Sequence, residues 1–163
     1  MSDILQAPPV TRPILYLLPG RFLLAYPPKR RRKKEIYTFA DLKQAFPTLG
    51  GVLDLQRAPR RWYDKDIEYK QIVLPGGPDA IPSPSKLEAC HRFIQQFHAN
   101  HPNQLLYIHC RHGINRTMMV VVSYLQQQGI EDAVSLFLHT RKIRIDRVRP
   151  HVLTCLRHVF RKN

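Results

Sequence analysis

The feature that most constrains the fold of this chain is a pair of apolar runs that flank one short polar loop. The first run is Leu105-Leu106-Tyr107-Ile108, and the second extends from Met118 to Leu125. A short apolar run bounded by turn residues is typical of a buried strand, whereas a longer one is typical of a helix. The order therefore predicts a buried strand, a tight loop and a buried helix. We call residues 109–117, which join the two runs, the Cys110 loop.

The composition of the Cys110 loop indicates an anion site. A tight loop at a helix N-terminus directs its backbone N–H groups inward, where they can surround a phosphate group. Gly113 permits a close approach of the backbone, and the planar guanidinium of Arg116 can bind two phosphate oxygens at once. The predicted phosphate-binding residues are consecutive: Arg111, His112, Gly113, Ile114, Asn115 and Arg116.

Cys110, at the start of the loop, is the predicted nucleophile. A cysteine in such an electropositive setting is expected to ionise, and a thiolate that faces a bound phosphate can attack phosphorus. Thr117 can donate a hydrogen bond to the sulfur and help it leave when a phosphocysteine breaks down. His109 is expected to order the loop or to tune the thiolate. The alternative is a structural cysteine before an ordinary strand–helix turn, which leaves the accompanying glycine, arginine and threonine unexplained.

The pattern His109-Cys110-x-x-Gly113-x-x-Arg116-Thr117 resembles the signature of the cysteine-dependent phosphatase superfamily. With His112 and Ile114-Asn115 included, it resembles the RNA 5′-triphosphatase branch, found in animal mRNA capping enzymes and in viral and stand-alone relatives. The resemblance covers roughly residues 13–160. It is carried further by four upstream segments: Gly20-Arg21-Phe22-Leu23, Val52-Leu53-Asp54-Leu55, Arg61-Trp62-Tyr63-Asp64 and Ile81-Pro82-Ser83.

Three features depart from the family pattern. Met118 stands where the family usually has glycine, and Arg111 replaces the common threonine. The family's C-terminal Arg-x-x-Gly-Ile segment here reads Arg141-Lys142-Ile143-Arg144-Ile145. Substrate contacts of the family in that last segment therefore do not transfer directly to this chain.

The resemblance implies a phosphatase that removes the γ-phosphate of triphosphate-ended RNA through a phosphocysteine, without a metal or another cofactor. Removal of the β-phosphate in a second round is left open. The implied partner is the RNA 5′ end. The chain contains no Lys-x-Asp-Gly nucleotidyl-transfer motif, so a separate guanylyltransferase is the expected second partner for capping.

Two carboxylates and one aromatic turn are further candidates. Asp79 lies upstream of Cys110 at about the distance of the general acid in protein-directed members of the superfamily, or it is a turn residue after Pro78. Asp54 is expected to support the loop or an arginine, because a carboxylate that touched the phosphate would repel it. Arg61-Trp62-Tyr63 combines a cation with aromatic rings and could stack a base, or it forms a packed turn.

The charge of the chain favours a polyanionic partner. Twenty-six Lys and Arg against twelve Asp and Glu give a formal net charge of +14, which attracts nucleic acid by its long-range field and by counterion release. The block Lys29–Lys34 is expected to be an exposed loop, and it could also contact RNA or act as a nuclear import signal. Near the C-terminus, Arg141 and Arg144 are predicted RNA contacts. The neighbouring Lys142, Arg147 and Arg149 either line the same groove or form a solvated face.

Strands that alternate with helices predict an α/β fold with a central, mainly parallel sheet flanked by helices. The loop then lies at the C-terminal edge of a strand, where such sheets bind ligands. The predicted strands cover residues 52–55, 68–74 and 105–109, and the predicted helices 38–46, 85–100, 115–128, 131–139 and 150–161. Thr38 and Ser85 are predicted N-caps. Gly50-Gly51 is expected to separate the first helix from the first of these strands, and Ile14–Leu18 is a candidate edge strand.

At 163 residues the chain is expected to form one catalytic domain over residues 13–163, preceded by a flexible arm over 1–12. Cys90, Cys110 and Cys155 have neither a disulfide-framework spacing nor a metal-ligand spacing, which favours a reducing compartment. There is no signal-peptide pattern and no apolar run long enough to span a membrane. We expect an intracellular monomer in the nucleus, with the cytoplasm as the alternative.

Two other functions compete with the RNA phosphatase. A dual-specificity protein phosphatase would account for Cys110, Arg116 and Asp79, but not for the charge of +14. A non-catalytic RNA-binding module would account for the charge, but it would have no need to keep both Cys110 and Arg116.

Overall fold

The computed structural model describes residues 16–32, 35–57, 64–78 and 80–158. Its centre is a sheet of four parallel strands in the order β1-β4-β2-β3. The strands are β1 (Leu17–Arg21), β2 (Leu49–Asp54), β3 (Glu68–Gln71) and β4 (Leu105–Cys110). The sheet confirms the predicted parallel arrangement, and β1 is the edge strand expected near residues 14–18.

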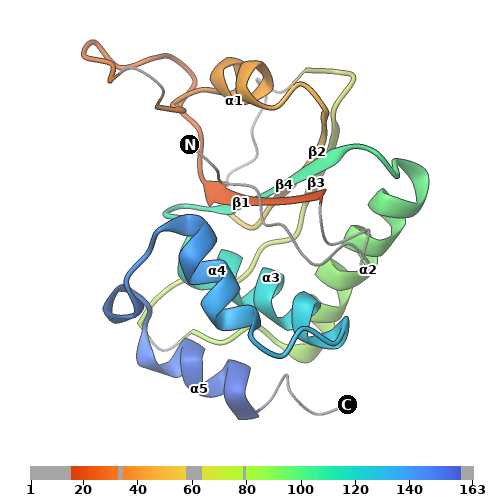
Figure 1. The fold of residues 1–163 in the computed structure, drawn as a ribbon, viewed down its shortest axis with the longest axis vertical. Helices are drawn as coiled ribbons and strands as arrows, with labels where there is room; N and C mark the ends of the chain where they lie inside the picture. Colours follow the sequence, from red (N-terminus) through yellow and green to blue (C-terminus); the bar gives the residue numbers. More distant parts are fainter. Residues whose placement is uncertain (1–15, 33–34, 58–63, 79, 159–163) are drawn as a thin grey trace.

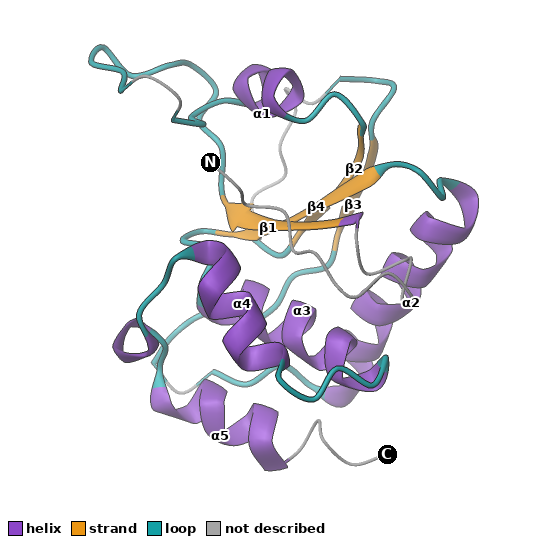
Figure 2. Ribbon diagram, in the orientation of Figure 1, coloured by secondary structure: helices purple, strands orange, loops and turns teal. Residues whose placement is uncertain are grey.

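Helices cover both faces of this sheet (Figure 1; Figure 2). Of the described helices, only the short α1 (Phe39–Ala45) lies on one face. The other face carries α2 (Pro84–Asn100), α3 (Asn115–Gln127), α4 (Ala133–Arg141) and α5 (Pro150–His158), with the 3₁₀ turn η2 (Ile145–Arg147) between the last two. Successive strand residues point to opposite faces, so Leu17 joins the larger apolar cluster and Leu18 joins the smaller cluster beside α1.

The helix that follows the Cys110 loop is buried on all sides over most of its length. Every residue of α3 from Thr117 to Leu125 is buried, and the helix packs against β4, α2, α4 and α5. A helix that is apolar all round belongs in the centre of a fold. The predicted helix over 115–128 is confirmed, and it ends where Gly129 takes a φ of +89°, a conformation that glycine adopts without strain.

The N-terminus of α2 differs from the prediction. The N-cap is Ser83 rather than Ser85: its Oγ accepts a hydrogen bond from the N–H of the third helical residue at 3.3 Å, and Pro84 takes the first helical position. Proline suits that position because its φ is already helical and its missing N–H is not needed there. At α1 the expected cap is confirmed, because Thr38 and Asp41 bond each other reciprocally at 3.2 and 3.0 Å.

The strands also differ in their limits from those predicted. Gly50 and Gly51 lie inside β2 instead of preceding it. Position 51 requires glycine because a Cβ there would lie 2.4 Å from the ring of Phe97. The missing side chain lets α2 pack closely on the strand. β3 ends at Gln71 instead of continuing to residue 74, since its register partner Asp54 is the last residue of β2.

Towards the C-terminus α4 covers residues 133–141 instead of 131–139, because the chain first makes a turn. α5 begins at Pro150 as predicted, and its described part reaches His158. In the basic block, residues 29–32 are exposed as expected, and Arg31 pairs with Asp41 at 2.5 Å. Lys33, Lys34 and the predicted arm over 1–12 lie outside the described residues.

Candidate active site

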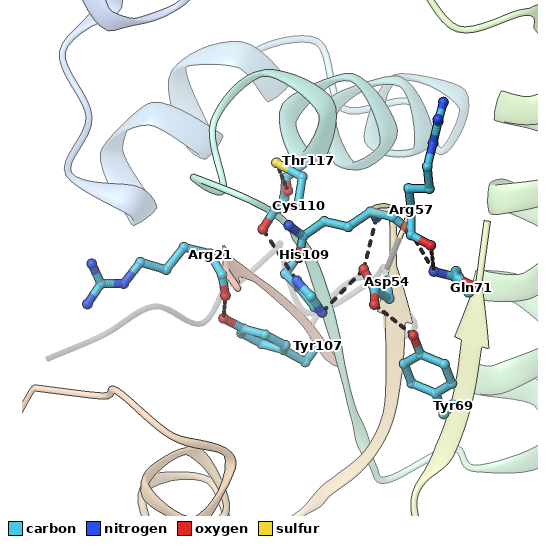
Figure 3. Close-up of polar contacts among 10 residues, drawn as sticks. Arg21, Asp54, Arg57, Tyr69, Gln71, Tyr107, His109, Cys110 and Thr117 are labelled. Atoms are coloured by element: carbon cyan, nitrogen blue, oxygen red, sulfur yellow. Dashed lines mark hydrogen bonds and ion pairs between the residues drawn. The ribbon is translucent and has the colours of Figure 1, made fainter. Parts of the chain in front are cut away.

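The Cys110 loop connects the central strand β4 to the N-terminus of α3 (Figure 3). Cys110 is the last residue of β4, in register with Arg21 at the end of β1, and is only 3% exposed. The hydroxyl of Thr117 donates a hydrogen bond to its Sγ at 3.1 Å. A donor at this distance can stabilise negative charge on the sulfur, which is the condition for the leaving-group role predicted for Thr117.

Gly113 brings the loop against the end of β1. Its φ is +70°, and a Cβ there would lie 2.4 Å from the carbonyl carbon and oxygen of Gly20. Beside it, the N–H of Phe22 donates to the carbonyl of Arg111 at 3.2 Å. Both the backbone conformation and the lack of space require a residue without a side chain. The close approach predicted for Gly113 is therefore an approach to β1.

The N-terminus of α3 carries no side-chain cap. Ile114 precedes the helix without a capping hydrogen bond, and the first turn contains no acidic residue. The first N–H groups of a helix have no partner within it and carry partial positive charge. This end of the helix can therefore hold an anion in front of Cys110.

A buried polar cluster supports the loop from the sheet (Figure 3). His109 and Asp54 are fully buried on neighbouring strands, with Nε2 of the histidine 3.7 Å from Oδ1 of the aspartate. Because a carbonyl oxygen only accepts, Nδ1 of His109 donates to the carbonyl of Cys110, at 3.3 Å. Asp54 also accepts from the phenol of Tyr69 at 2.7 Å and from the N–H of Gln56 at 2.9 Å. Asp54 therefore lies beside His109 beneath the loop, and the supporting role expected for it stays a prediction.

A small pocket of about 70 Å³ opens over Cys110. Its basic lining residues come from two places, Arg116 in the first turn of α3 and Arg149 just before α5. Among the residues that the structure describes, no carboxylate lines it. The pocket is also lined by Gly76, Ala80, His112, Asn115 and His151.

Two hydrogen bonds hold the C-terminal segment beside this pocket. The N–H of Arg149 donates to the side-chain oxygen of Asn115 at 3.0 Å. Nε2 of His151 donates to the carbonyl of Ala80 at 3.1 Å, and so ties α5 to the opposite wall. The sequence did not predict His151, and it placed Arg149 only among the C-terminal basic residues. The sequence around Arg149 and His151 gives little indication of a site, because its one recognisable pattern is Pro150 at the start of a helix.

Three further arginines that were predicted to bind phosphate or RNA lie within the described residues, and their surroundings differ. Arg111 is exposed and does not line the pocket over Cys110. Arg141 donates through Nε to the carbonyl of Gly113 at 3.3 Å, so it contacts the loop directly. Arg144 forms an exposed pair with Asp146 at 2.6 Å and is turned to the surface. The RNA-binding roles of Arg141 and Arg144 stay predictions.

Cys110 is distinguished from the other two cysteines by its surroundings. All three are free and buried. Burial raises the pKa of Cys90, in α2, to about 12, so this thiol is protonated near neutral pH. Neither Cys90 nor Cys155 lines the pocket. Cys110 is therefore the one cysteine placed to act on a ligand there.

Some predictions fall outside the described residues, namely those for Asp79 and for Arg61-Trp62-Tyr63. Within the described ranges, no group of three or more His, Cys, Asp or Glu could hold a metal ion. In the same part of the chain, none of the helices has the length and apolarity needed to cross a membrane.

The parallel sheet, and a cysteine at the end of its central strand facing a helix N-terminus and an arginine, define a cysteine-dependent phosphatase. The model of the protein-tyrosine phosphatase family matches residues 61–157. The chain belongs to this family.

Curated relatives fall into two groups. The chain is 28% identical over 124 residues to the tyrosine-protein phosphatase of Autographa californica nuclear polyhedrosis virus. The match covers 71% of the chain and 72% of that protein. The chain is 30% identical over 107 residues to the mRNA-capping enzyme of Danio rerio, a match of 61% of the chain but only 18% of that enzyme. Among solved structures, DUSP15 matches with a TM-score of 0.66 at 19% identity, over 89% of this chain and 83% of that one.

Proposed function

We propose that the chain is an RNA 5′-phosphatase that removes the γ-phosphate from triphosphate-ended RNA. The observation that carries this proposal is the second arginine, Arg149, which lines the pocket over Cys110 together with Arg116. One guanidinium fork is enough for a single phosphoryl group, so a second one favours a substrate with further phosphates. The net charge of +14 and the similarity to the mRNA-capping enzyme of Danio rerio support RNA as the carrier of those phosphates.

The reaction proceeds in two displacements. Sγ of Cys110 attacks the γ-phosphorus in line as the bond to the bridging oxygen breaks, and RNA leaves with a 5′-diphosphate. Arg116 and the N–H groups of the loop bind the three equatorial oxygens, so the positive charge comes from the protein and no metal is required. Water then attacks the phosphocysteine, inorganic phosphate leaves, and Thr117 stabilises the departing thiolate.

The leaving group decides how much acid catalysis is needed. A diphosphate is stable as an anion, whereas the alkoxide of a serine needs a proton as it departs. The proposed reaction therefore depends less on a general acid at Asp79 than protein dephosphorylation would. A second round at the same pocket would remove the β-phosphate and leave a monophosphate end.

A dual-specificity protein phosphatase is the second candidate, favoured by the similarity to the viral tyrosine-protein phosphatase. It accounts for Cys110, Arg116 and Thr117, but it gives no purpose to Arg149 in the pocket or to the net charge. A non-catalytic RNA-binding module is the third, and the contact between Thr117 and the sulfur of Cys110 argues against it.

The wider setting follows from the proposed reaction. A guanylyltransferase would complete the cap, since residues 1–163 contain no Lys-x-Asp-Gly motif. Nascent transcripts would place the reaction in the nucleus, and we propose that the domain acts as a monomer.

One assay separates the three candidates. The protein is incubated in EDTA with γ-labelled triphosphate-ended RNA and, in parallel, with a phosphotyrosine peptide. Faster release from RNA supports the proposal, and a preference for the peptide favours the second candidate. Tight RNA binding without turnover on either substrate favours the third. Cys110→Ser should abolish release while RNA binding survives, and an active Ser variant would exclude the phosphocysteine mechanism.

A further inference from the structure

A second and larger pocket, of about 360 Å³, lies on the other side of the Cys110 loop. Pockets of about 300–1,000 Å³ are typical of sites for small ligands. Three arginines from three different elements line it: Arg21 at the end of β1, Arg141 at the end of α4, and Arg147 in η2. We call it the arginine pocket.

The arginine pocket carries an excess of positive charge. Glu35 is the one carboxylate among its described lining residues. Within the described part of the chain, neither Arg21 nor Arg147 is paired with a carboxylate, and Arg21 lies over the ring of Tyr37 at 6.0 Å from its centroid. The exposed guanidinium groups of Arg21 and Arg147 therefore face solvent with their charge available to an anion.

The two pockets share one wall, the Cys110 loop. His112 lines both, while Ile114 lines the arginine pocket and Asn115 lines the pocket over Cys110. Arg141 is fixed to this wall by its hydrogen bond to the carbonyl of Gly113. The guanidinium of Arg21 points away from Cys110 (Figure 3), so it cannot serve the reacting phosphate.

The remaining surface of the arginine pocket suits a ligand that is only partly charged. Ile36 and Ile143 are half-buried lining residues, and they leave apolar surface between the arginines. A free phosphate would use only the charges. A nucleotide chain offers both internucleotide phosphates and apolar ring faces, and it contacts proteins through cations and through its bases.

We propose that the arginine pocket binds the first nucleotides of the RNA whose 5′-triphosphate occupies the pocket over Cys110. This inference rests on the proposed function. The RNA leaves the reacting end past His112, and its internucleotide phosphates reach Arg21, Arg141 and Arg147. The pocket thereby distinguishes a triphosphate-ended RNA from a free nucleoside triphosphate, which has no internucleotide phosphate to place there.

The test compares two double variants that lower the net charge equally. Arg21→Glu with Arg147→Glu reverses charge in the arginine pocket. Arg92→Glu with Arg157→Glu reverses it at exposed positions that line neither pocket. The kcat/KM values are measured for a short triphosphate-ended RNA and for the nucleoside triphosphate with the same first base.

We expect the first variant to lower the ratio of these two values, RNA over nucleoside triphosphate, by roughly tenfold or more relative to the control variant. The slope of log kcat/KM for RNA against log salt should become shallower by about 1.4, because each lost contact with single-stranded RNA contributes about 0.7. Equal ratios and equal slopes in the two variants would overturn the inference and leave the proposed function intact.

A binding experiment separates the inference from the proposed function. The same substitutions are made in the Cys110→Ser background, and the affinity for labelled triphosphate-ended RNA is measured. If the wild-type chain releases no phosphate from RNA but the arginine-pocket variant still binds RNA more weakly than the control, the proposed activity fails and the RNA site stands. If the two variants bind equally, the arginine pocket is not an RNA site.

Discussion

The phenol of Tyr69, in β3, donates a 2.7 Å hydrogen bond to Oδ2 of the buried Asp54, in β2. The other carboxylate oxygen of Asp54 lies 3.7 Å from Nε2 of His109, the residue before the nucleophilic cysteine. Three neighbouring strands thus contribute to one polar cluster beneath the Cys110 loop. We expect Tyr69 to orient the carboxylate of Asp54 and this carboxylate, in turn, to position His109.

We predict that Tyr69→Phe lowers kcat several-fold and leaves KM nearly unchanged. The substitution keeps the ring but removes the donor to Asp54, so the effect reaches Cys110 through His109 without a contact to substrate. Stability should fall by about 1 kcal/mol, the usual cost of a lost hydrogen bond. Steady-state kinetics and thermal unfolding measure both. The control is Tyr26→Phe, at a tyrosine that is 83% exposed; a rise in KM in Tyr69→Phe would contradict the indirect role.

Gly113→Ala should disable the loop. The new Cβ would lie 2.4 Å from the backbone of Gly20, in a residue whose φ is +70°. A left-handed conformation costs a non-glycine residue about 1–2 kcal/mol, and the loop must also move to relieve the clash. We expect loss of most phosphatase activity.

The matched control for Gly113→Ala is Gly129→Ala. Gly129 has a φ of +89°, but a Cβ there meets no atom within 4 Å. The Gly129→Ala variant should lose a similar free energy of unfolding, measured by denaturant unfolding, and its kcat should stay unchanged. Equal losses of activity in the two variants would show that displacement of the loop is not the cause.

Thr117→Val should slow the second displacement more than the first. Valine keeps the shape of threonine but cannot donate to Sγ of Cys110, so the thiolate is a poorer leaving group from the phosphocysteine. In rapid-quench experiments we expect a burst of the first product followed by slow turnover. Thr154→Val, which removes an exposed hydroxyl bonded to Pro150, should show no burst. A Thr117→Val enzyme that forms its phosphocysteine slowly would place the hydroxyl in the first step.

Arg149→Ala should distinguish polyphosphate substrates from monophosphates. Arg149 lines the pocket over Cys110, whereas its bond to Asn115 uses the backbone N–H and survives the substitution. A hydrogen bond to a charged group contributes about 1.5–3 kcal/mol, so kcat/KM for triphosphate-ended RNA should fall at least tenfold. The loss on p-nitrophenyl phosphate should be smaller. Equal losses on both substrates would assign Arg149 to the reacting phosphate; Arg157→Ala is the control.

Two buried histidines should make the fold sensitive to acid. Burial lowers the pKa of His91 from 6.5 to about 4 and also lowers the pKa of His98. The unfolded chain therefore binds more protons than the folded one, so stability is full above about pH 6.5 and falls as the pH drops towards 4. For His91 the loss amounts to about 3 kcal/mol. Urea unfolding at several pH values measures this, and His91→Gln should flatten the dependence; an unchanged slope in that variant would exclude His91 as its source.

The sequence predicted those parts of the site that are contiguous in the chain. A strand, a glycine-containing loop and an apolar helix follow one another around Cys110, so local patterns were enough to place the nucleophile at the edge of a parallel sheet. The same reasoning failed at Ser83, where a proline at the first helical position mattered more than a capping pattern that begins at Ser85. It also failed at Gly51, whose role depends on the ring of Phe97 in another element.

The rest of the site depends on contacts between distant segments. Arg149 and His151 reach the pocket because α5 packs against the loop between β3 and α2. The hydrophobic periodicity of the sequence does not predict this contact. Tyr69 joins the cluster at Asp54 through the pairing of two strands, which a single sequence does not specify. The arginine pocket likewise collects residues from the first strand and from the last third of the chain.

The burial of α3 over residues 117–125 has a consequence for how the protein opens locally. Segments with exposed backbone and few apolar contacts unfold most often, whereas a helix packed on every side opens only when the whole domain does. The first turn of α3 is thus attached to the slowest-opening part of the molecule. Its N–H groups should therefore keep their directions when exposed segments open, so global stability adds to the loop's own contacts in preorganising the anion site.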